Sequence, residues 1–141
     1  MKIVLDTNCL VNVIMPGSFN NDVWQAFRAA KYTLCVSNDI LFEYHEILAK
    51  RYNGLIANTV LKELIETPNV EHINPTYRFN LITADPDDNK FVDCAIIAGA
   101  TYIVSNDRHF AELEKHDFPK VDVRSLPDFL GIVKSLLTAS N

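Results

Sequence analysis

Short apolar runs recur along the chain, and each is followed by one or more segments in which apolar residues return at every third or fourth position. Short runs bounded by polar residues favour buried strands, whereas the longer spacing favours helices that pack on a core. Strands are predicted over residues 2–5, 32–37, 70–75, 101–107 and 121–125, and helices over residues 22–31, 37–52, 58–68, 85–100, 108–115 and 125–137.

The alternation of strands and helices, with short connections, predicts an α/β fold. Strands joined through helices run parallel, and helices then cover both faces of the sheet. The chain has 141 residues, 48% of them hydrophobic, which suits one core rather than two. We therefore expect a single three-layer α/β/α domain over residues 1–141, with a mostly parallel central sheet of about five strands.

Composition favours a soluble, cytoplasmic protein without a membrane partner. No apolar run approaches the roughly 20 residues that cross a bilayer, and the first residues lack the pattern of a signal peptide. The cysteines, Cys9, Cys35 and Cys94, are widely spaced among apolar neighbours. We expect them to be small core residues, because neither a disulfide framework nor a CxxC motif is present.

Acidic residues occur where the predicted strands end. Asp6 ends the first strand, and Asp107 follows the strand YIVS. Glu43 lies on the helix that leaves the second strand, and three acids, Asp85, Asp87 and Asp88, open the helix before YIVS. Ligands of open parallel sheets bind outside the carboxyl ends of the strands, so these acids are expected to converge there. Converging carboxylates are the ligands that hard divalent cations require.

Each acid also has a purely structural explanation. Asp6 could accept hydrogen bonds in a turn, and Asp107 could cap the segment that follows it. Asp85, Asp87 and Asp88 could cap a helix and interact with its dipole, and Glu43 could lie on a solvated helix face. These explanations do not account for acids at the same end of four separate elements.

Net charge does not exclude a nucleic-acid partner. The formal charge is −5, which disfavours phosphate binding, but two bound divalent cations would add four charges and bring it to −1. Other chemistries find little support. The sequence has no glycine-rich phosphate loop and no nucleophile elbow, and its histidines (His45, His72, His109 and His116) lack zinc-site spacing.

Four motifs together carry a family resemblance. They are IVLDTN at Asp6, S-x-x-I-L-x-E-Y with its acid at Glu43, DPDDNKFVDCA, and YIVSND ending at Asp107. In order and spacing they resemble the motifs of PIN-domain nucleases, specifically the branch that contains toxin components of toxin–antitoxin systems. The resemblance extends from Lys2 to about Leu130. It implies the same α/β/α fold.

The resemblance also assigns residues. Asp6, Glu43 and Asp107 match the first, second and fourth acids of the family. Asp88 is preferred to Asp93 as the third, because Phe91 and Ala95 follow it as an apolar and a small residue do in the family helix. Thr7, Asn8 and Ser105 match the polar residues that orient the acids, with Asp93 as a further supporting residue. Ser105 and Asn106 depart from the more usual residues but leave the hydroxyl and carboxylate in place.

A metal-dependent ribonuclease follows from the resemblance. All-oxygen ligands suit Mg²⁺ or Mn²⁺, and one or two such ions would promote hydrolysis of single-stranded RNA that leaves a 5′-phosphate. The four acids would hold the metal. We expect contacts to the RNA backbone from the neighbouring basic side chains of Lys50, Arg51, Lys90 and Arg108.

The resemblance to the toxin branch also implies protein partners. Many of its members bind a small inhibitory antitoxin or form homodimers. Trp24, Phe27 and the segment FLGIVKSLL are candidates for such a surface, although packing in the core also accounts for them.

Two other functions stay open on the sequence alone. One is a Mg²⁺-dependent phosphotransfer domain, of the phosphatase or receiver type, in which Asp6 would be the nucleophile. The second acid that such sites carry two residues later is absent here, where Thr7 and Asn8 follow. The other is a catalytically silent RNA- or protein-binding PIN-like module, because activity depends on fine placement of the ligands.

Overall fold

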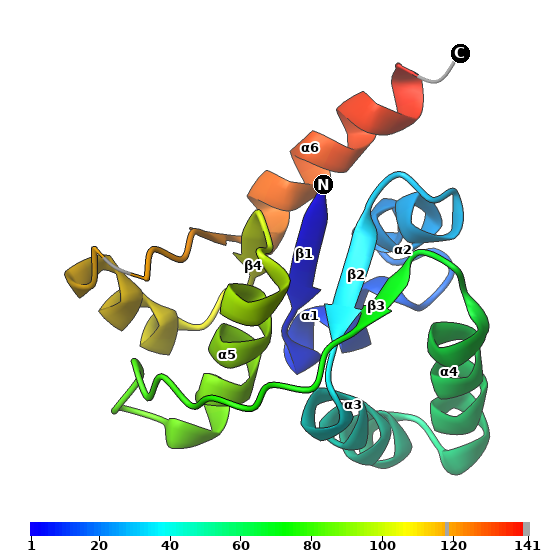
Figure 1. Cartoon of the computed structure of the whole chain (residues 1–141). Coiled ribbons are helices and arrows are strands. Elements are labelled where there is room, and N and C mark those ends of the chain that lie inside the picture. Colours follow the sequence, from blue (N-terminus) through cyan, green and yellow to red (C-terminus); the bar gives the residue numbers. More distant parts are fainter. Residues whose placement is uncertain (118, 140–141) are drawn as a thin grey trace.

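Five parallel strands form the centre of the molecule. The computed structural model describes residues 1–117 and 119–139. Its sheet has the order β3-β2-β1-β4-β5, and each pairing of neighbouring strands is parallel (Figure 1). The strands are β1 (Lys2–Leu5), β2 (Thr33–Val36), β3 (Val70–His72), β4 (Tyr102–Val104) and β5 (Val123–Arg124). The prediction of a mostly parallel sheet of about five strands is confirmed.

Helices cover both faces of this sheet. In Figure 1, α5 lies in front of β4, and it contacts β1, β2 and β4, whereas α2 lies behind the sheet and contacts α6 and α1. The long helices α3 and α4 pack against each other beside the β3 edge. The helices are α1 (Thr7–Val13), α2 (Asn21–Arg28), α3 (Asn38–Arg51), α4 (Gly54–Glu66), α5 (Asn89–Ala98) and α6 (Leu126–Thr138). The predicted α/β/α layering is therefore confirmed.

The strand order places a crevice beside β1. The chain builds β1, β2 and β3 outward in one direction, then crosses back to place β4 on the other side of β1. The connections that leave β1 and β4 diverge at this point, which is where parallel sheets bind ligands. Ile3, Val4 and Leu5 pair in register with Tyr102, Ile103 and Val104, so the two strands end level with each other.

Several local elements differ from the expectation. Residues 7–13, for which no element was predicted, form α1 directly after β1. The predicted helix over residues 108–115 is a 3-10 helix, η2 (Arg108–Lys115), and a short 3-10 turn, η1 (Pro86–Asp88), precedes α5. The strands β3 and β5 are shorter than the apolar runs that predicted them.

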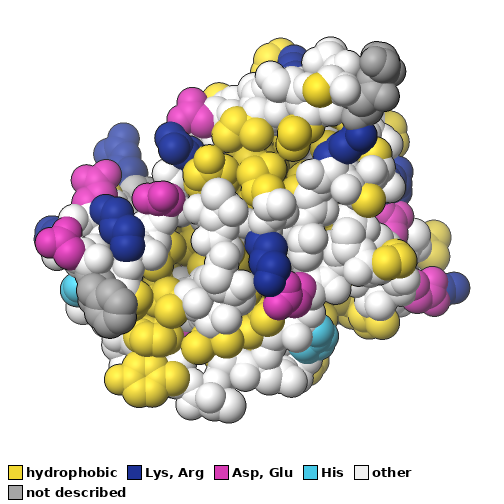
Figure 2. Space-filling model, turned by 45° about the horizontal axis from the view of Figure 1, so that its top comes forward, with side chains coloured by type: hydrophobic (Ala, Val, Ile, Leu, Met, Phe, Trp, Pro, Cys, Tyr) yellow, Lys and Arg dark blue, Asp and Glu magenta, His cyan; other side chains and the backbone are white. Residues whose placement is uncertain are grey.

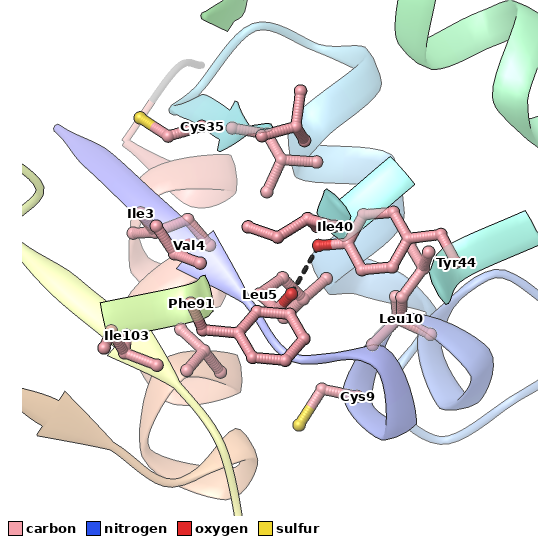
Figure 3. Close-up of a cluster of buried hydrophobic side chains, with 14 of the residues drawn as sticks. Ile3, Val4, Leu5, Cys9, Leu10, Cys35, Ile40, Tyr44, Phe91 and Ile103 are labelled. Carbon is pink, nitrogen blue, oxygen red and sulfur yellow. Dashed lines mark hydrogen bonds between the residues drawn. The ribbon is translucent and has the colours of Figure 1, made fainter. Parts of the chain in front are cut away.

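The core lies on both faces of β1 and its neighbours. Ile3, Val4 and Leu5 are buried, and Tyr44 on α3 donates its hydroxyl to the Leu5 carbonyl at the end of β1 (Figure 3). The predicted burial of the three cysteines, Cys9, Cys35 and Cys94, is confirmed. Trp24 and Phe27 are also buried, so neither side chain is available for a surface contact.

Charges are dispersed on the face that carries the beginnings of the strands. Figure 2 brings this end forward and shows hydrophobic side chains beside α6, with lysines and arginines that lie singly on its described surface. A nucleic-acid surface would gather basic side chains. Within residues 1–117 and 119–139, no helix combines the length and the apolar character needed to cross a bilayer.

Candidate active site

Asp6 connects the end of β1 to the start of α1. Its Oδ1 accepts a hydrogen bond from the Cys9 backbone N–H at 2.8 Å, which caps α1, and its Oδ2 accepts one from the Ser105 hydroxyl. The side chain is buried, and both oxygens are fixed by these donors. Asp6 therefore does accept a hydrogen bond in a turn, as its structural explanation proposed. Its bond to Ser105 also connects it to the segment after β4.

Ser105 connects Asp6 to Asp107. Besides donating to Asp6, its hydroxyl oxygen accepts the Asp107 backbone N–H at 2.9 Å. Asp107 Oδ1 in turn accepts the His109 backbone N–H at 2.9 Å and caps η2. A single hydroxyl thus orients one acid directly and the backbone of the other.

His109 brings Asp88 and Asp85 to the same place. Its Nδ1 lies 3.2 Å from Asp107 Oδ1, 3.3 Å from Asp88 Oδ2 and 3.8 Å from Asp85 Oδ2. Burial, followed by the nearby charges of Asp107 and Asp85, raises the pKa of Asp88 to about 6, although His109 opposes this shift. The raised pKa therefore reflects burial first and the neighbouring carboxylates of Asp107 and Asp85 second.

Glu43 contacts residues that lie beside Asp6 and Asp88 in the chain. Its Oε2 accepts the Thr7 hydroxyl, and its Oε1 lies 2.7 Å from Lys90 Nζ. Thr7 follows Asp6 in the chain, and Lys90 lies two residues after Asp88. Glu43 is therefore neutralised by a lysine of α5 and does not share the group formed by Asp85, Asp88 and His109.

Asp93 has a different environment from Asp88. Its Oδ1 accepts the Phe79 backbone N–H at 3.1 Å, which anchors the segment before η1, and burial raises its pKa. Asp88 contacts His109 beside Asp107 instead. Of the two candidates for the third acid, the structure thus places Asp88 with Asp107 and gives Asp93 a structural contact.

Asp6 and Glu43 line two different hollows. The smaller, of about 280 Å³, is lined by Asp6, Asn8 and Asp107 together with Cys9, Asn12, Asn106 and Leu126. The larger, of about 650 Å³, lies between α3 and α5, and its walls include Glu43, Lys90, Asp93 and Arg78. Asp6 and Asp107 therefore share a pocket, whereas Glu43 faces the adjoining cleft.

The four predicted basic residues have different surroundings. Lys90 pairs with Glu43 inside the cleft. Lys50 pairs with Glu46 one turn away on the exposed side of α3, and Arg51 ends that helix. Arg108 begins η2 next to Asp107. Lys90 and Arg108 thus lie beside the acids, while Lys50 and Arg51 lie at the far end of α3.

The donor atoms suit a divalent cation. Asp6, Asp88 and Asp107 supply carboxylate oxygens around the crevice, although the group with ligand atoms within 4.8 Å of one another is Asp85, Asp88 and His109. The positive charge of an ion would offset both the burial and the carboxylate repulsion that raise the pKa of Asp88. The buried polar side-chain atoms within residues 1–117 and 119–139 all have hydrogen-bond partners. The ligands are therefore oriented by contacts of the chain itself.

Sequence reasoning missed the contacts that His109 makes. We expected no zinc site at the histidines, because none has a partner at zinc spacing along the chain. In the structure, Asp85, Asp88 and His109 offer ligand atoms within 4.8 Å of one another. The available signal was the position of His109 two residues after Asp107, at the start of an element that turns back over the site.

The PIN domain is the family whose model matches this chain, over residues 2–109. None of the curated proteins matches significantly. Among solved structures, VapBC2 from Rickettsia felis bound to a promoter DNA fragment has 20% identity and a TM-score of 0.59, with 89% of this chain and 98% of that chain covered.

Two further solved structures share the fold. VapC20 from Mycobacterium tuberculosis, described as a sarcin-ricin loop cleaving toxin, has 15% identity and a TM-score of 0.57, with 77% of this chain and 92% of that chain covered. DNA-bound VapBC from Salmonella typhimurium has 17% identity and a TM-score of 0.56, with coverage of 89% and 98%. All three likenesses, at these identities, show a shared fold.

Proposed function

The chain belongs to the PIN-domain family, and from this premise we propose that it is a divalent-metal-dependent endoribonuclease that hydrolyses phosphodiester bonds of single-stranded RNA. The observation that carries the proposal is the linkage of Asp6 and Asp107 through Ser105 at the crevice between β1 and β4. Asp88, which meets Asp107 at His109, adds a third carboxylate.

In this proposal the acids divide into two roles. Asp6, Asp88 and Asp107 hold Mg²⁺ or Mn²⁺, as one or two ions, and Glu43 completes the site from α3. A bound divalent ion supplies an activated water and neutralises charge on the phosphate. Ser105 and Thr7 fix the carboxylates of Asp6 and Glu43, and Asn8 extends the polar wall of the Asp6 pocket.

The basic residues guide the substrate. Lys90 and Arg108 contact the phosphate backbone, with Lys50 and Arg51 further along α3. Lys90 must exchange its ion pair with Glu43 for a phosphate, which the arrival of a cation at Glu43 would permit. Asp93 supports the cleft wall through its bond to Phe79.

The contacts of Asp6 also bear on the alternative in which it is a phosphoryl acceptor. A nucleophilic carboxylate must present one oxygen to phosphorus. Both oxygens of the buried Asp6 accept hydrogen bonds from groups of the chain, namely Cys9 N–H and the Ser105 hydroxyl. This arrangement suits an oriented metal ligand better than a nucleophile.

We extend the proposal to partners through the solved structures of similar fold. Two of them contain VapBC complexes with DNA, and a third is described as a sarcin-ricin loop cleaving toxin. On this basis the chain acts as the toxin of a toxin–antitoxin pair in the cytoplasm, and binds a small antitoxin. A homodimer would use surfaces other than Trp24 and Phe27, which are buried.

Cleavage of a mixed-sequence single-stranded RNA tests the function. We expect 5′-phosphorylated fragments in Mg²⁺ or Mn²⁺, no cleavage in EDTA, and a loss of at least about 100-fold in Asp6→Asn and Asp107→Asn. Glu66→Gln, which removes an exposed charge from the end of α4, should cleave like the wild type. Equal activity in the wild type and in both aspartate variants would identify a contaminating nuclease and refute the proposal.

A further inference from the structure

We propose that His109 binds the metal directly through Nδ1 and gives this site a preference for Mn²⁺ over Mg²⁺. The inference rests on the proposed metal-dependent function and concerns which ion the site selects. The acids around the crevice offer oxygen atoms, whereas His109 adds a nitrogen donor among them. An imidazole ligand changes the chemistry of an otherwise all-oxygen site.

The spacing of the donor atoms suits a shared ion. Ligands that bind one octahedral ion at about 2.1 Å lie between about 3 and 4.2 Å from one another. His109 Nδ1 lies 3.2 Å from Asp107 Oδ1, 3.3 Å from Asp88 Oδ2 and 3.8 Å from Asp85 Oδ2. All three separations from Nδ1 fall within that interval. Asp85, Asp88 and His109 also place ligand atoms within 4.8 Å of one another, so these three residues carry the inference, and Asp107 adjoins them through His109.

The backbone holds His109 in this position. Its N–H donates to Asp107 Oδ1, so the residue that supplies one ligand also fixes the start of the 3-10 helix that supplies the other. The imidazole is 42% exposed, which leaves a path for water and a cation. Without a metal, Nδ1–H donates a hydrogen bond to Asp88 Oδ2. A bound ion would take the place of this proton and accept the Nδ1 lone pair, with the ring proton on Nε2.

Lys90 directs the ion toward this group. Its ammonium lies 2.7 Å from Glu43 and occupies the position beside that carboxylate. A first cation therefore meets less repulsion at Asp88, Asp107 and His109 than at Glu43. Mg²⁺ favours oxygen ligands and retains its waters, whereas Mn²⁺ accepts imidazole more readily, so the nitrogen favours Mn²⁺.

Electron paramagnetic resonance of the full chain loaded with Mn²⁺ tests the ligand without a need for activity. We expect a pulsed spectrum with the coupling of a directly bound ¹⁴N, and its loss in His109→Gln. The same substitution should weaken Mn²⁺ binding by about tenfold or more, while Mg²⁺ binding, measured by competition, changes less than the Mn²⁺ value. His45→Gln is the matched control, because His45 bonds to Asn58 on α4.

The outcomes separate this inference from the proposed function. Absence of ¹⁴N coupling, a coupling that persists in His109→Gln, or equal losses of Mn²⁺ and Mg²⁺ affinity would overturn the role of His109, even if RNA is still cleaved. Failure of the chain to bind Mn²⁺ would overturn it as well. Nitrogen coupling in a protein that cleaves no RNA would instead support the ligand and contradict the nuclease. Melting without metal should show that His109→Gln is folded.

Discussion

At the residue scale, one hydroxyl orients two of the candidate ligands. Ser105 donates to Asp6 and accepts from the Asp107 backbone, and its side chain is buried. Groups behind a metal ligand fix its direction, and their loss commonly lowers metal affinity or activity by about 10- to 100-fold. If Asp6 and Asp107 bind a metal as proposed, Ser105 is a positioning residue that acts through these two acids.

Removal of this hydroxyl should reduce both metal affinity and cleavage. We expect Ser105→Ala to lower kcat/KM on RNA and Mn²⁺ affinity by about 10-fold or more. The stability loss should be about 1–3 kcal/mol, because the Asp107 N–H loses its acceptor and Asp6 Oδ2 loses its donor. Ser105→Thr, which keeps the hydroxyl, should restore most of the activity. If threonine rescues nothing while the variant remains folded, Ser105 acts through packing and the positioning role is wrong.

Asp88 makes stability depend on pH. Its folded pKa of about 6 exceeds that of an ordinary aspartate, so proton binding stabilises the fold at low pH and this contribution is lost as pH rises through about 6. Without metal, Asp88→Asn should therefore have a higher Tm than the wild type at pH 8, and the difference in Tm should shrink toward pH 5. Thermal melting in EDTA at both pH values measures this.

A control for that measurement lies next to Asp88. Asp87→Asn removes the same charge from the same turn, yet Asp87 is not among the groups that raise the pKa of Asp88. Its melting difference from the wild type should change little between pH 5 and 8. A similar pH dependence in both variants would show that the total charge, rather than the environment of Asp88, sets the effect.

Individual side chains show where sequence reasoning ends. Asp6 and Asp107 could be placed at one edge because a parallel sheet aligns the ends of β1 and β4. The contacts of His109 could not be predicted from the sequence, because they depend on how η2 turns after Asp107 and on the 3-10 turn η1, which presents Asp85 and Asp88. Such turns leave no periodic signal in a sequence.

At the element scale, β1, α1 and α3 act together to present the site. Asp6 caps α1, so the start of this short helix is fixed at the candidate metal ligand. The helix α3 begins at its own cap, Ser37. The helix α1 was not predicted because its seven residues are too few to show a period and include β-branched residues. The longer helices were predictable, since several turns of apolar spacing define each of them.

The contact that joins α3 to β1 should matter for stability. Tyr44 donates its hydroxyl to the Leu5 carbonyl, and both groups are buried one residue away from Glu43 and Asp6 respectively (Figure 3). Tyr44→Phe leaves that carbonyl without its donor, which should cost about 1–3 kcal/mol. Urea denaturation measures the loss, and cleavage should fall because α3 carries Glu43.

Tyr52 provides the comparison. Its hydroxyl donates to the Val11 carbonyl at 2.9 Å, but the contact is only partly buried. Tyr52→Phe should therefore lose less stability than Tyr44→Phe, because water can replace the donor. An equal or larger loss at Tyr52 would contradict the view that the buried bond beside Leu5 anchors α3.

At the scale of the whole molecule, charge and site are coupled. The chain carries 18 acidic and 13 basic residues, which gives −5. Several of the acids are concentrated at the crevice, and the described lysines and arginines on the face shown in Figure 2 lie singly. In the proposed site, a bound cation would relieve the local repulsion and give the phosphate a positive charge to bind.

Stabilisation by metal distinguishes this local effect from general screening. At a Mn²⁺ concentration about 100 times its Kd, binding should stabilise the fold by about 2.7 kcal/mol, which raises Tm by about 8 °C for a chain of this size, and EDTA should reverse the change. Asp107→Asn and Glu66→Gln each reduce the net charge from −5 to −4. If screening were responsible, both would respond to Mn²⁺ like the wild type. If the acids form the site, Glu66→Gln keeps the shift and Asp107→Asn loses most of it, because only the latter removes a ligand from beside His109.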